Sequence, residues 1–221
     1  MSTEPSNADF SSTPRLEALF EELQTNDFEI VIQHLLNAAR VVEVYRPKLP
    51  RLAARLRKDA ELVKTALVEA VAKHHPDRPY DIEERCYQRC REFITQFHHI
   101  FSLNYDVLLY WALMQDEIDE IDYACDDGFR HPDQDPNLPW VSWQQGQKAN
   151  INFLHGALHL FDQSTDIIKY TWSKTDIPIV DQIRSALDED KYPIFVSEGT
   201  SASKWRKIMH NAYLHKCLTR N

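Results

Sequence analysis

The chain has 221 residues, of which 43% are hydrophobic and 27% are charged, the composition of a globular protein with one buried core. Its formal net charge of −9 argues against a general nucleic-acid binder, and the one basic stretch, Arg46–Lys58, is typical of the solvated face of a helix. No apolar run reaches the roughly 20 residues that span a bilayer, and the polar start MSTEPSNADFSSTP has no basic segment followed by an apolar one, as a secretory signal would.

Glycine and cysteine are both sparse, and each scarcity excludes a kind of site. Only four glycines are present, and Gly128 is the first of them. A Gly-rich phosphate loop therefore has no place in residues 1–127, because such loops need backbone conformations and close approaches that glycine alone permits. The four cysteines have no framework spacing, so we expect a reduced, cytoplasmic protein. From the net charge and the lack of a long apolar run, we expect no nucleic-acid and no membrane partner.

Helical patterns dominate residues 14–97, after a polar stretch, residues 1–13, that we expect to be disordered or extended. The segment TPRLEALFEELQ predicts a short helix. The segment NDFEIVIQHLLNAARVVEVY predicts a stronger one, capped by Asn26, with its apolar residues on one face. A long helix is expected over Pro50–Lys73, and Asp81 is the expected cap of a helix in DIEERCYQRCREFITQF.

Strand patterns alternate with helical patterns in residues 98–221. HHIFSLN has the β-branched and aromatic density of a short buried strand, and YDVLLYWALMQDEIDEID is helical in pattern. NINFLHGALHLFD predicts a second strand region that forms a hairpin with DIIKYTW. A helix in IPIVDQIRSALDED, a strand in YPIFVSE and a closing helix in SASKWRKIMHNAYLHKCL follow. We expect one α/β domain over residues 14–221, with residues 14–97 as its helical part.

The segment from residue 124 to residue 148 is expected to be a long loop, rich in Asp, Pro and Gln. Loops of this length are usually functional lids or mobile segments. Its two tryptophans, Trp140 and Trp143, either close over a bound base or anchor the loop on the domain. The apolar area of two indole rings favours the anchor.

Two polar junctions interrupt the apolar runs of the second half. Asn104, Tyr105 and Asp106 follow the first expected strand, and His155 and Gly156 lie inside the apolar run of the second. Ligands of open α/β sheets bind outside the carboxyl ends of the strands. We therefore expect Asn104 and His155 to lie at the ends of adjacent strands, with both side chains opening into one concavity.

A third polar junction, FVSEGTSASK, joins the last expected strand to the closing helix and contains Ser197, Gly199, Thr200 and Ser201. Backbone N–H groups at the start of that helix are suited to hold an anion.

Each junction also has a purely structural interpretation. Asn104 or Asp106 is a suitable cap for the following helix. His155 is suited to a structural, hydrogen-bonded role. The residues from Ser197 to Ser203 can form an ordinary helix entry.

A metal site is disfavoured. Cys86 and Cys90 share a helix face, and His98 and His99 follow in sequence. These residue types are the ones that bind zinc in proteins. Adjacent residues of a strand point to opposite faces, so both histidines do not converge easily. We expect no metal.

Taken together, several of these segments resemble known proteins. FSLNYDVLLYWAL is similar to the T-x-N-Y-D-x-L-L-E stretch of the SIR2-like proteins, the sirtuin-related NAD-binding and NAD-hydrolysing domains, and NFLHGALHLF is similar to their K-L-H-G strand. More closely, the set TNDFEIVIQHLL, LNYDVLLYW, DDGF, LHGALHLF and FVSEGTSASKWRKI resembles the DUF4917 family, a bacterial group distantly related to SIR2. The resemblance runs from residue 16 to the C-terminus. It implies a reduced Rossmann-like, SIR2-like three-layer α/β core with a large helical N-terminal portion.

The resemblance also implies roles for three residues. Asn104 matches the Asn that contacts the nicotinamide-side ribose, Asp106 matches the acid that supports the same pocket, and His155 matches the general base that acts on a ribose hydroxyl. Cleavage of the nicotinamide bond develops oxocarbenium character, as in glycoside hydrolysis. An amide side chain can orient hydroxyls or a water, and a neutral imidazole can take a proton.

These matches imply NAD or ADP-ribose as the ligand, with Asn104 and His155 as catalytic residues. The residues implied around the nucleotide are Asn104, Tyr105, Asp106, Gly156, Ser197, Gly199, Thr200 and Ser201.

The sequence departs from the SIR2 pattern at its start and at its end. SIR2-like domains open with a strand and a Gly-rich loop, where this chain has MSTEPSNADFSSTP, and family members continue past the last helix into another strand. We therefore expect an NAD glycohydrolase-like activity, of bacterial defence type, that is weak or missing in this chain. A version extended upstream to include a Gly-rich strand and loop is expected to be active. The alternative is a non-catalytic interaction module of the same fold, with a second copy or another protein as its partner.

Overall fold

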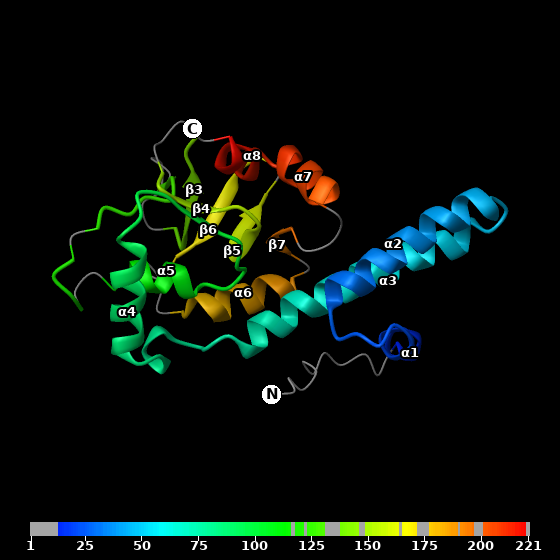
Figure 1. Ribbon diagram of the computed structural model, residues 1–221, viewed down its shortest axis with the longest axis horizontal. Helices are drawn as coiled ribbons and strands as arrows, with labels where there is room; N and C mark the ends of the chain where they lie inside the picture. Colours follow the sequence, from blue (N-terminus) through cyan, green and yellow to red (C-terminus); the bar gives the residue numbers. More distant parts are fainter. Residues whose placement is uncertain are drawn as a thin grey trace. The chain divides into compact units, whose positions relative to one another are not determined.

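The computed structural model describes residues 13–115, 118–121, 123–130, 138–145, 149–163, 165–171, 177–189, 191–196 and 201–219. Over these residues the protein is a mixed α/β structure with eight α-helices and two sheets (Figure 1). The chain divides into two compact units. The helical unit comprises the described residues up to Lys73 together with residues 201–206, and the sheet unit comprises the described residues of 74–196 and 207–219. The expected disorder of residues 1–13 concerns a stretch of which only Thr13 is described.

The helical unit is built on α1 (Pro14–Glu22), α2 (Phe28–Tyr45) and α3 (Pro50–His74), and α2 and α3 lie side by side (Figure 1). All three helices were expected from the sequence. The cap of α2 is Asp27 rather than the predicted Asn26, because the Asp27 carboxylate accepts hydrogen bonds from the backbone N–H groups of the first helical turn. The apolar residues of α2 lie on one face of the helix, and this face packs into the core. The core of the helical unit consists of Leu16, Phe28, Val31, Ile32, Leu35, Ala60 and Val63.

The turn between α2 and α3 carries exposed basic and apolar side chains. Every residue from 43 to 52 is exposed, and Tyr45 keeps 79% of its surface accessible. All six Arg and Lys side chains between Arg46 and Lys58 are exposed. The prediction of a solvated helix face is confirmed for the four that lie on α3, whereas Arg46 and Lys48 lie in the turn.

The sheet unit contains short strands and mostly short helices. In chain order its elements are the 3₁₀ turn η1 (Pro79–Asp81), α4 (Glu84–Ile94), β1 (Ile100–Ser102), α5 (Leu108–Leu113), β2 (Phe129–Arg130), β3 (Trp140–Trp143), β4 (Ile151–Phe153), β5 (Gly156–Asp162), β6 (Ile167–Tyr170), α6 (Ile179–Asp188) and β7 (Pro193–Phe195). The helix α7 (Ser201–His210) begins in the helical unit and ends in the sheet unit. The last helix, α8 (Ala212–Leu218), belongs to the sheet unit.

Parallel pairing among the described strands is confined to β1 and β4, which form a two-stranded sheet. The other sheet has the order β2-β3-β6-β5-β7 and is antiparallel at every described pairing. The hairpin expected between residues 150–162 and 166–172 is confirmed in the pairing of β5 with β6. A Rossmann-like three-layer core is not confirmed, because such a core rests on a sheet of several parallel strands.

Three predicted elements differ in extent from the structure. The expected loop from residue 124 to residue 148 contains β2 and β3, and Trp140 and Trp143 are residues of β3. The helix expected to continue through DEIDEID is limited to the six residues of α5. The closing helix is divided at Asn211, whose side chain accepts a hydrogen bond from the Leu214 N–H and so begins α8.

The core of the sheet unit lies under α8. The hydroxyl oxygen of Tyr213 accepts a hydrogen bond of 3.1 Å from the backbone N–H of Phe153, and its ring contacts Phe129 and Trp143. Trp143 thus serves as an anchor on the core, the interpretation that the sequence favoured. Around them pack Ile94, Leu113, Val141, Ile151, Ala157, Leu160, Ile194, Val196, Ile208, Leu214 and Cys217.

Gly156 begins β5 at a point where two strands come unusually close. Its φ is +81°, and a Cβ built there would lie 1.9 Å from the carbonyl oxygen of Ile194 in β7. Both the backbone conformation and the space exclude a side chain. Gly128 has a similar φ of +82°, but its nearest neighbours would be 3.6 Å away.

The variant Gly156→Ala is expected to lose about 3 kcal/mol or more of unfolding free energy, because backbone strain and displacement of β7 add together. The matched control Gly128→Ala meets only the backbone strain and is expected to lose about 1–2 kcal/mol. Urea denaturation of both variants measures the difference, and equal losses would show that the close approach to Ile194 has no energetic weight.

Candidate functional site

Asn104 and His155 follow two neighbouring strands. β1 and β4 pair in parallel with Ser102 opposite Phe153, so Asn104 and His155 each lie two residues beyond that last pair. The Leu154 N–H also donates to the Ser102 carbonyl at 3.0 Å, which extends the pairing toward the two residues. The expectation that they occupy the ends of adjacent strands is therefore confirmed. A shared concavity for their side chains stays a prediction.

Tyr105 joins all three polar junctions of the second half. Its ring stacks on Phe195 at the end of β7, with 3.7 Å between ring centroids, and lies 6.3 Å from the His155 ring at an interplanar angle of 24°. Its hydroxyl donates to the Val196 carbonyl at 2.9 Å, and the Val196 N–H donates to the His155 carbonyl at 3.0 Å. The ends of β1, β4 and β7 thus meet at one place. We call these residues, 104–106, 155–156 and 195–196, the strand-end cluster.

The polar members of the strand-end cluster have different environments. Asn104 is exposed, and its N–H donates to the Ser102 hydroxyl at 3.2 Å. His155 is half-buried. The Asp106 carboxylate accepts the Leu108 N–H at 2.9 Å in the turn that precedes α5, whose N-cap residue is Val107 rather than Asn104 or Asp106. The exposed Asn104 side chain therefore lies two residues from the Asp106 carboxylate, which is already hydrogen-bonded to the backbone.

The third junction is described only in part. Ser197, Gly199 and Thr200 lie outside the described residues, and Ser201 is the exposed first residue of α7. The anion-holding role expected of this segment stays a prediction.

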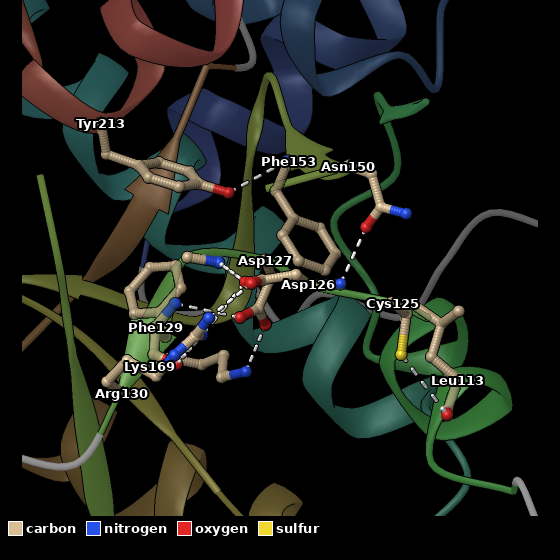
Figure 2. A network of polar contacts seen from close by, with 11 residues as sticks. Leu113, Cys125, Asp126, Asp127, Phe129, Arg130, Asn150, Phe153, Lys169 and Tyr213 are labelled. Atoms are coloured by element: carbon tan, nitrogen blue, oxygen red, sulfur yellow. Dashed lines mark hydrogen bonds and ion pairs between the residues drawn. The ribbon is translucent and has the colours of Figure 1, made fainter. Parts of the chain in front are cut away.

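The DDGF segment, Asp126–Phe129, forms a polar network that residue types alone did not reveal (Figure 2). The Asp126 side chain accepts from the Gly128 N–H at 2.7 Å and from the Arg130 guanidinium. Its carbonyl accepts the Asn150 and Ile151 N–H groups at 2.7 and 3.0 Å, which fastens the segment to the start of β4.

Lys169, on β6, is the buried cation of this network. It pairs with the Asp127 carboxylate, and its ammonium lies 4.8 Å from the Tyr110 ring centroid and 5.4 Å from that of Phe129. Only 6% of Lys169 is exposed, so the carboxylate and the two aromatic faces replace the water that a lysine normally keeps.

Two buried histidines of the sheet unit, His75 and His159, were not predicted from the sequence. The Nε2 of His75 lies 3.2 Å from the Val107 N–H, and its Nδ1 lies 2.8 Å from the Pro76 carbonyl. Nε2 must accept and Nδ1 must donate, so the imidazole is neutral. Burial lowers the pKa of His75.

His159 is fully buried in β5, and neither ring nitrogen has a hydrogen-bond partner among the described residues. Its ring lies against Tyr110 and Phe153. Burial holds the pKa of His159 well below its ordinary value, and the positive charge of Lys169 adds to the effect. The signal available in the sequence was its position in GALHLF, where apolar residues flank it on both sides, as in a strand buried on both faces.

A pocket of about 630 Å³ opens elsewhere in the sheet unit. None of the described residues that were expected to bind a nucleotide lines it. Its lining consists of Pro79, Tyr80, Ile82, Glu83, Glu84, Tyr87, Tyr110, Trp111, Met114, Gln115 and Ile118.

Within the part of the chain that the structure describes, no group of three or more His, Cys, Asp or Glu side chains could hold a metal ion. No described helix is long and apolar enough to cross a membrane.

The fold and the strand-end cluster define a mixed α/β protein with a parallel strand pair whose ends carry Asn104 and His155. Comparison with protein families finds a match to "Domain of unknown function (DUF4917)" over residues 8–221, and the chain belongs to this family. Comparison with curated proteins and with solved structures finds no match.

The buried histidines make stability depend on pH. In the unfolded chain a histidine binds a proton below a pKa of about 6.5, whereas His75 and His159 resist protonation in the fold. The unfolded state therefore binds more protons as the pH falls through about 6.5, and stability is lost in that direction, by up to about 1.4 kcal/mol per pH unit for each histidine.

We expect His159→Leu to lose less stability between pH 7 and pH 5 than the unchanged chain, by about 1–2 kcal/mol, because one of these protons is no longer taken up. Urea denaturation across this range measures it. His98→Leu, at an exposed position, is the control and should keep the original dependence. Identical curves for His159→Leu and the unchanged chain would contradict the account.

Proposed function

We propose that the chain is a SIR2-like nucleotide-binding protein that takes NAD or ADP-ribose at the strand-end cluster, with the chemistry of an NAD glycohydrolase. The observation that carries the proposal is the parallel pairing of β1 with β4, which puts Asn104 and His155 beyond the carboxyl ends of adjacent strands. This is where α/β proteins with parallel strands bind their ligands. In this proposal β1 and β4 belong to a reduced Rossmann-like core.

The residue types suit the reaction. Departure of nicotinamide leaves positive charge on the ribose, as in glycoside hydrolysis. The exposed Asn104 amide would orient the ribose hydroxyls or the attacking water, and the half-buried His155 imidazole would accept a proton from one of them. Tyr105 holds the cluster together through its stacking on Phe195 and its bond to Val196, and so acts as a positioning residue.

Such a site would bind the phosphates of the nucleotide weakly. Residues 1–127 contain no glycine, so the chain has no Gly-rich loop there. The segment from Ser197 to Ser201 would supply only part of the missing N–H donors. Each charge-assisted hydrogen bond contributes roughly 1.5–3 kcal/mol. The loss of two such bonds would weaken binding by on the order of a hundredfold or more.

A second candidate is a non-catalytic interaction module. It is favoured by the turn between α2 and α3, where Val44, Tyr45 and Leu49 are exposed among arginines and lysines. Exposed apolar side chains gathered in one place mark a docking surface more often than scattered ones do. Under this hypothesis a protein, rather than a nucleotide, is the ligand.

The purified chain is expected to bind ADP-ribose weakly but saturably in a calorimetric titration, and to consume NAD slowly or not at all. Asn104→Ala should weaken ADP-ribose binding by about tenfold, which is the loss of one hydrogen bond to a ribose hydroxyl. Any NAD consumption should fall by about a hundredfold or more in His155→Ala, because the general base is removed. His98→Ala, at an exposed position of the same unit, should change neither.

Three outcomes would count against parts of the proposal. If neither NAD nor ADP-ribose binds saturably, the interaction module is the better account. Turnover unaffected by Asn104→Ala and His155→Ala removes their catalytic roles. Rapid turnover that His155→Ala abolishes would retain the site and show that the Gly-rich loop is dispensable.

A further inference from the structure

The pocket of the sheet unit is a separate site from the strand-end cluster. Its volume of about 630 Å³ lies in the range of small-molecule sites, about 300–1,000 Å³. Four aromatic side chains line it, and two of its lining residues are unusually exposed for their type: Tyr80 keeps 68% and Met114 keeps 51% of its surface accessible. Exposed apolar side chains at the mouth of a concave site indicate recognition rather than core packing.

The walls of the pocket are held in place by buried polar contacts. Arg91 of α4 forms an ion pair of 2.7 Å with Asp119 and donates to the Ala112 carbonyl, which joins α4 to α5 and to the segment after it. The Tyr87 hydroxyl donates to the Pro79 carbonyl at 2.8 Å, which joins α4 to η1. Burial raises the pKa of Tyr87 to about 12, so this donor persists at neutral pH. When the walls of a pocket are already in place, binding of a ligand loses little conformational entropy of the protein.

The charges of the lining select the sign of the ligand. Among the described lining residues, Glu83 and Glu84 carry carboxylates, and none is Lys, Arg or His. A phosphate or carboxylate would therefore meet two like charges and no cation from the described lining residues. Glu83 also pairs with Arg85, but both side chains are well exposed, so water weakens that pair.

The aromatic walls favour the same sign. The guanidinium of Arg78 already lies 5.7 Å from the centroid of the Tyr80 ring, which is a cation–π distance. The indole N–H of Trp111, another lining residue, has no hydrogen-bond partner among the described residues, and as a donor it would meet an oxygen of the ligand rather than its ammonium group.

We propose that this pocket binds a small organic cation, an ammonium group carried on a compact apolar body. The carboxylates of Glu83 and Glu84 face its charge, and the rings of Tyr80, Tyr87 and Trp111 enclose its apolar groups. The site is independent of the proposed nucleotide chemistry, since the two share no residue.

The test compares choline with its neutral isostere 3,3-dimethylbutan-1-ol in NMR titrations of the full chain, with benzyltrimethylammonium as a larger cationic probe. Choline should bind about tenfold more tightly than the alcohol, because cation–π contacts and the carboxylates act only on the charged molecule. Glu84→Gln should remove most of this preference while leaving the affinity for the alcohol unchanged. Tyr80→Ala should weaken both cations by about five- to tenfold.

Matched controls separate the pocket from the surface in general. Glu92→Gln, at an exposed position of α4 outside the lining, and Tyr45→Ala, in the helical unit, should change neither titration. Equal affinity for choline and the alcohol would overturn the proposal. A preference that survives in Glu84→Gln, or the absence of saturable binding by both cationic probes, would overturn it as well.

Discussion

The close approach of Gly156 to β7 is the constraint on which the rest of the sheet unit depends. Because no side chain separates Gly156 from the Ile194 carbonyl, β5 and β7 pair directly. Val196, just after β7, can then donate its N–H to the His155 carbonyl. Tyr105 can then stack on Phe195 and bond to Val196 from the end of β1. One glycine thus brings together three segments that are about 50 and 40 residues apart along the chain.

Buried charges fix the frame around this junction. Lys169 pairs with Asp127 and Arg91 pairs with Asp119, and all four side chains lie mostly or wholly out of water. Such pairs add little net stability, but removing one partner leaves a buried charge uncompensated. They therefore penalise alternative registers of β6 and alternative positions of the segment after α5. Together with the apolar core, these two pairs explain how strands of two to seven residues hold a defined arrangement.

The sequence predicted those parts of the fold that have a local cause. The apolar stripe of α2 follows from periodicity within one segment, and β5, β6 and β7 follow from short apolar runs within theirs. β2 and β3 were missed because their pairing partners set their conformation: Trp140 pairs with Tyr170, thirty residues away in sequence. The contact between Lys169 and Asp127 has no periodic signature at all.

The candidate site divides in the same way. Residue types at strand ends pointed to Asn104, Tyr105 and His155, and the pairing of β1 with β4 put them beside one another. The pocket between α4 and α5 could not be predicted from the sequence, because a cavity depends on how helices with ordinary sequences pack. His159 was missed although apolar residues flank it in GALHLF, because its complete burial becomes visible only once β5 is packed in the sheet.

The central claim is that residues 104–106, 155–156 and 195–196 form one nucleotide site. The most direct measurement is an NMR titration of the isotopically labelled chain with ADP-ribose, read residue by residue. The account predicts that saturable shifts concentrate on the backbone amides of Asn104, Tyr105, His155 and Val196, while those around Tyr80 and Met114 stay unchanged. Saturable shifts confined to the pocket of Tyr80 and Met114, or no saturable shift at the strand-end cluster, would contradict it.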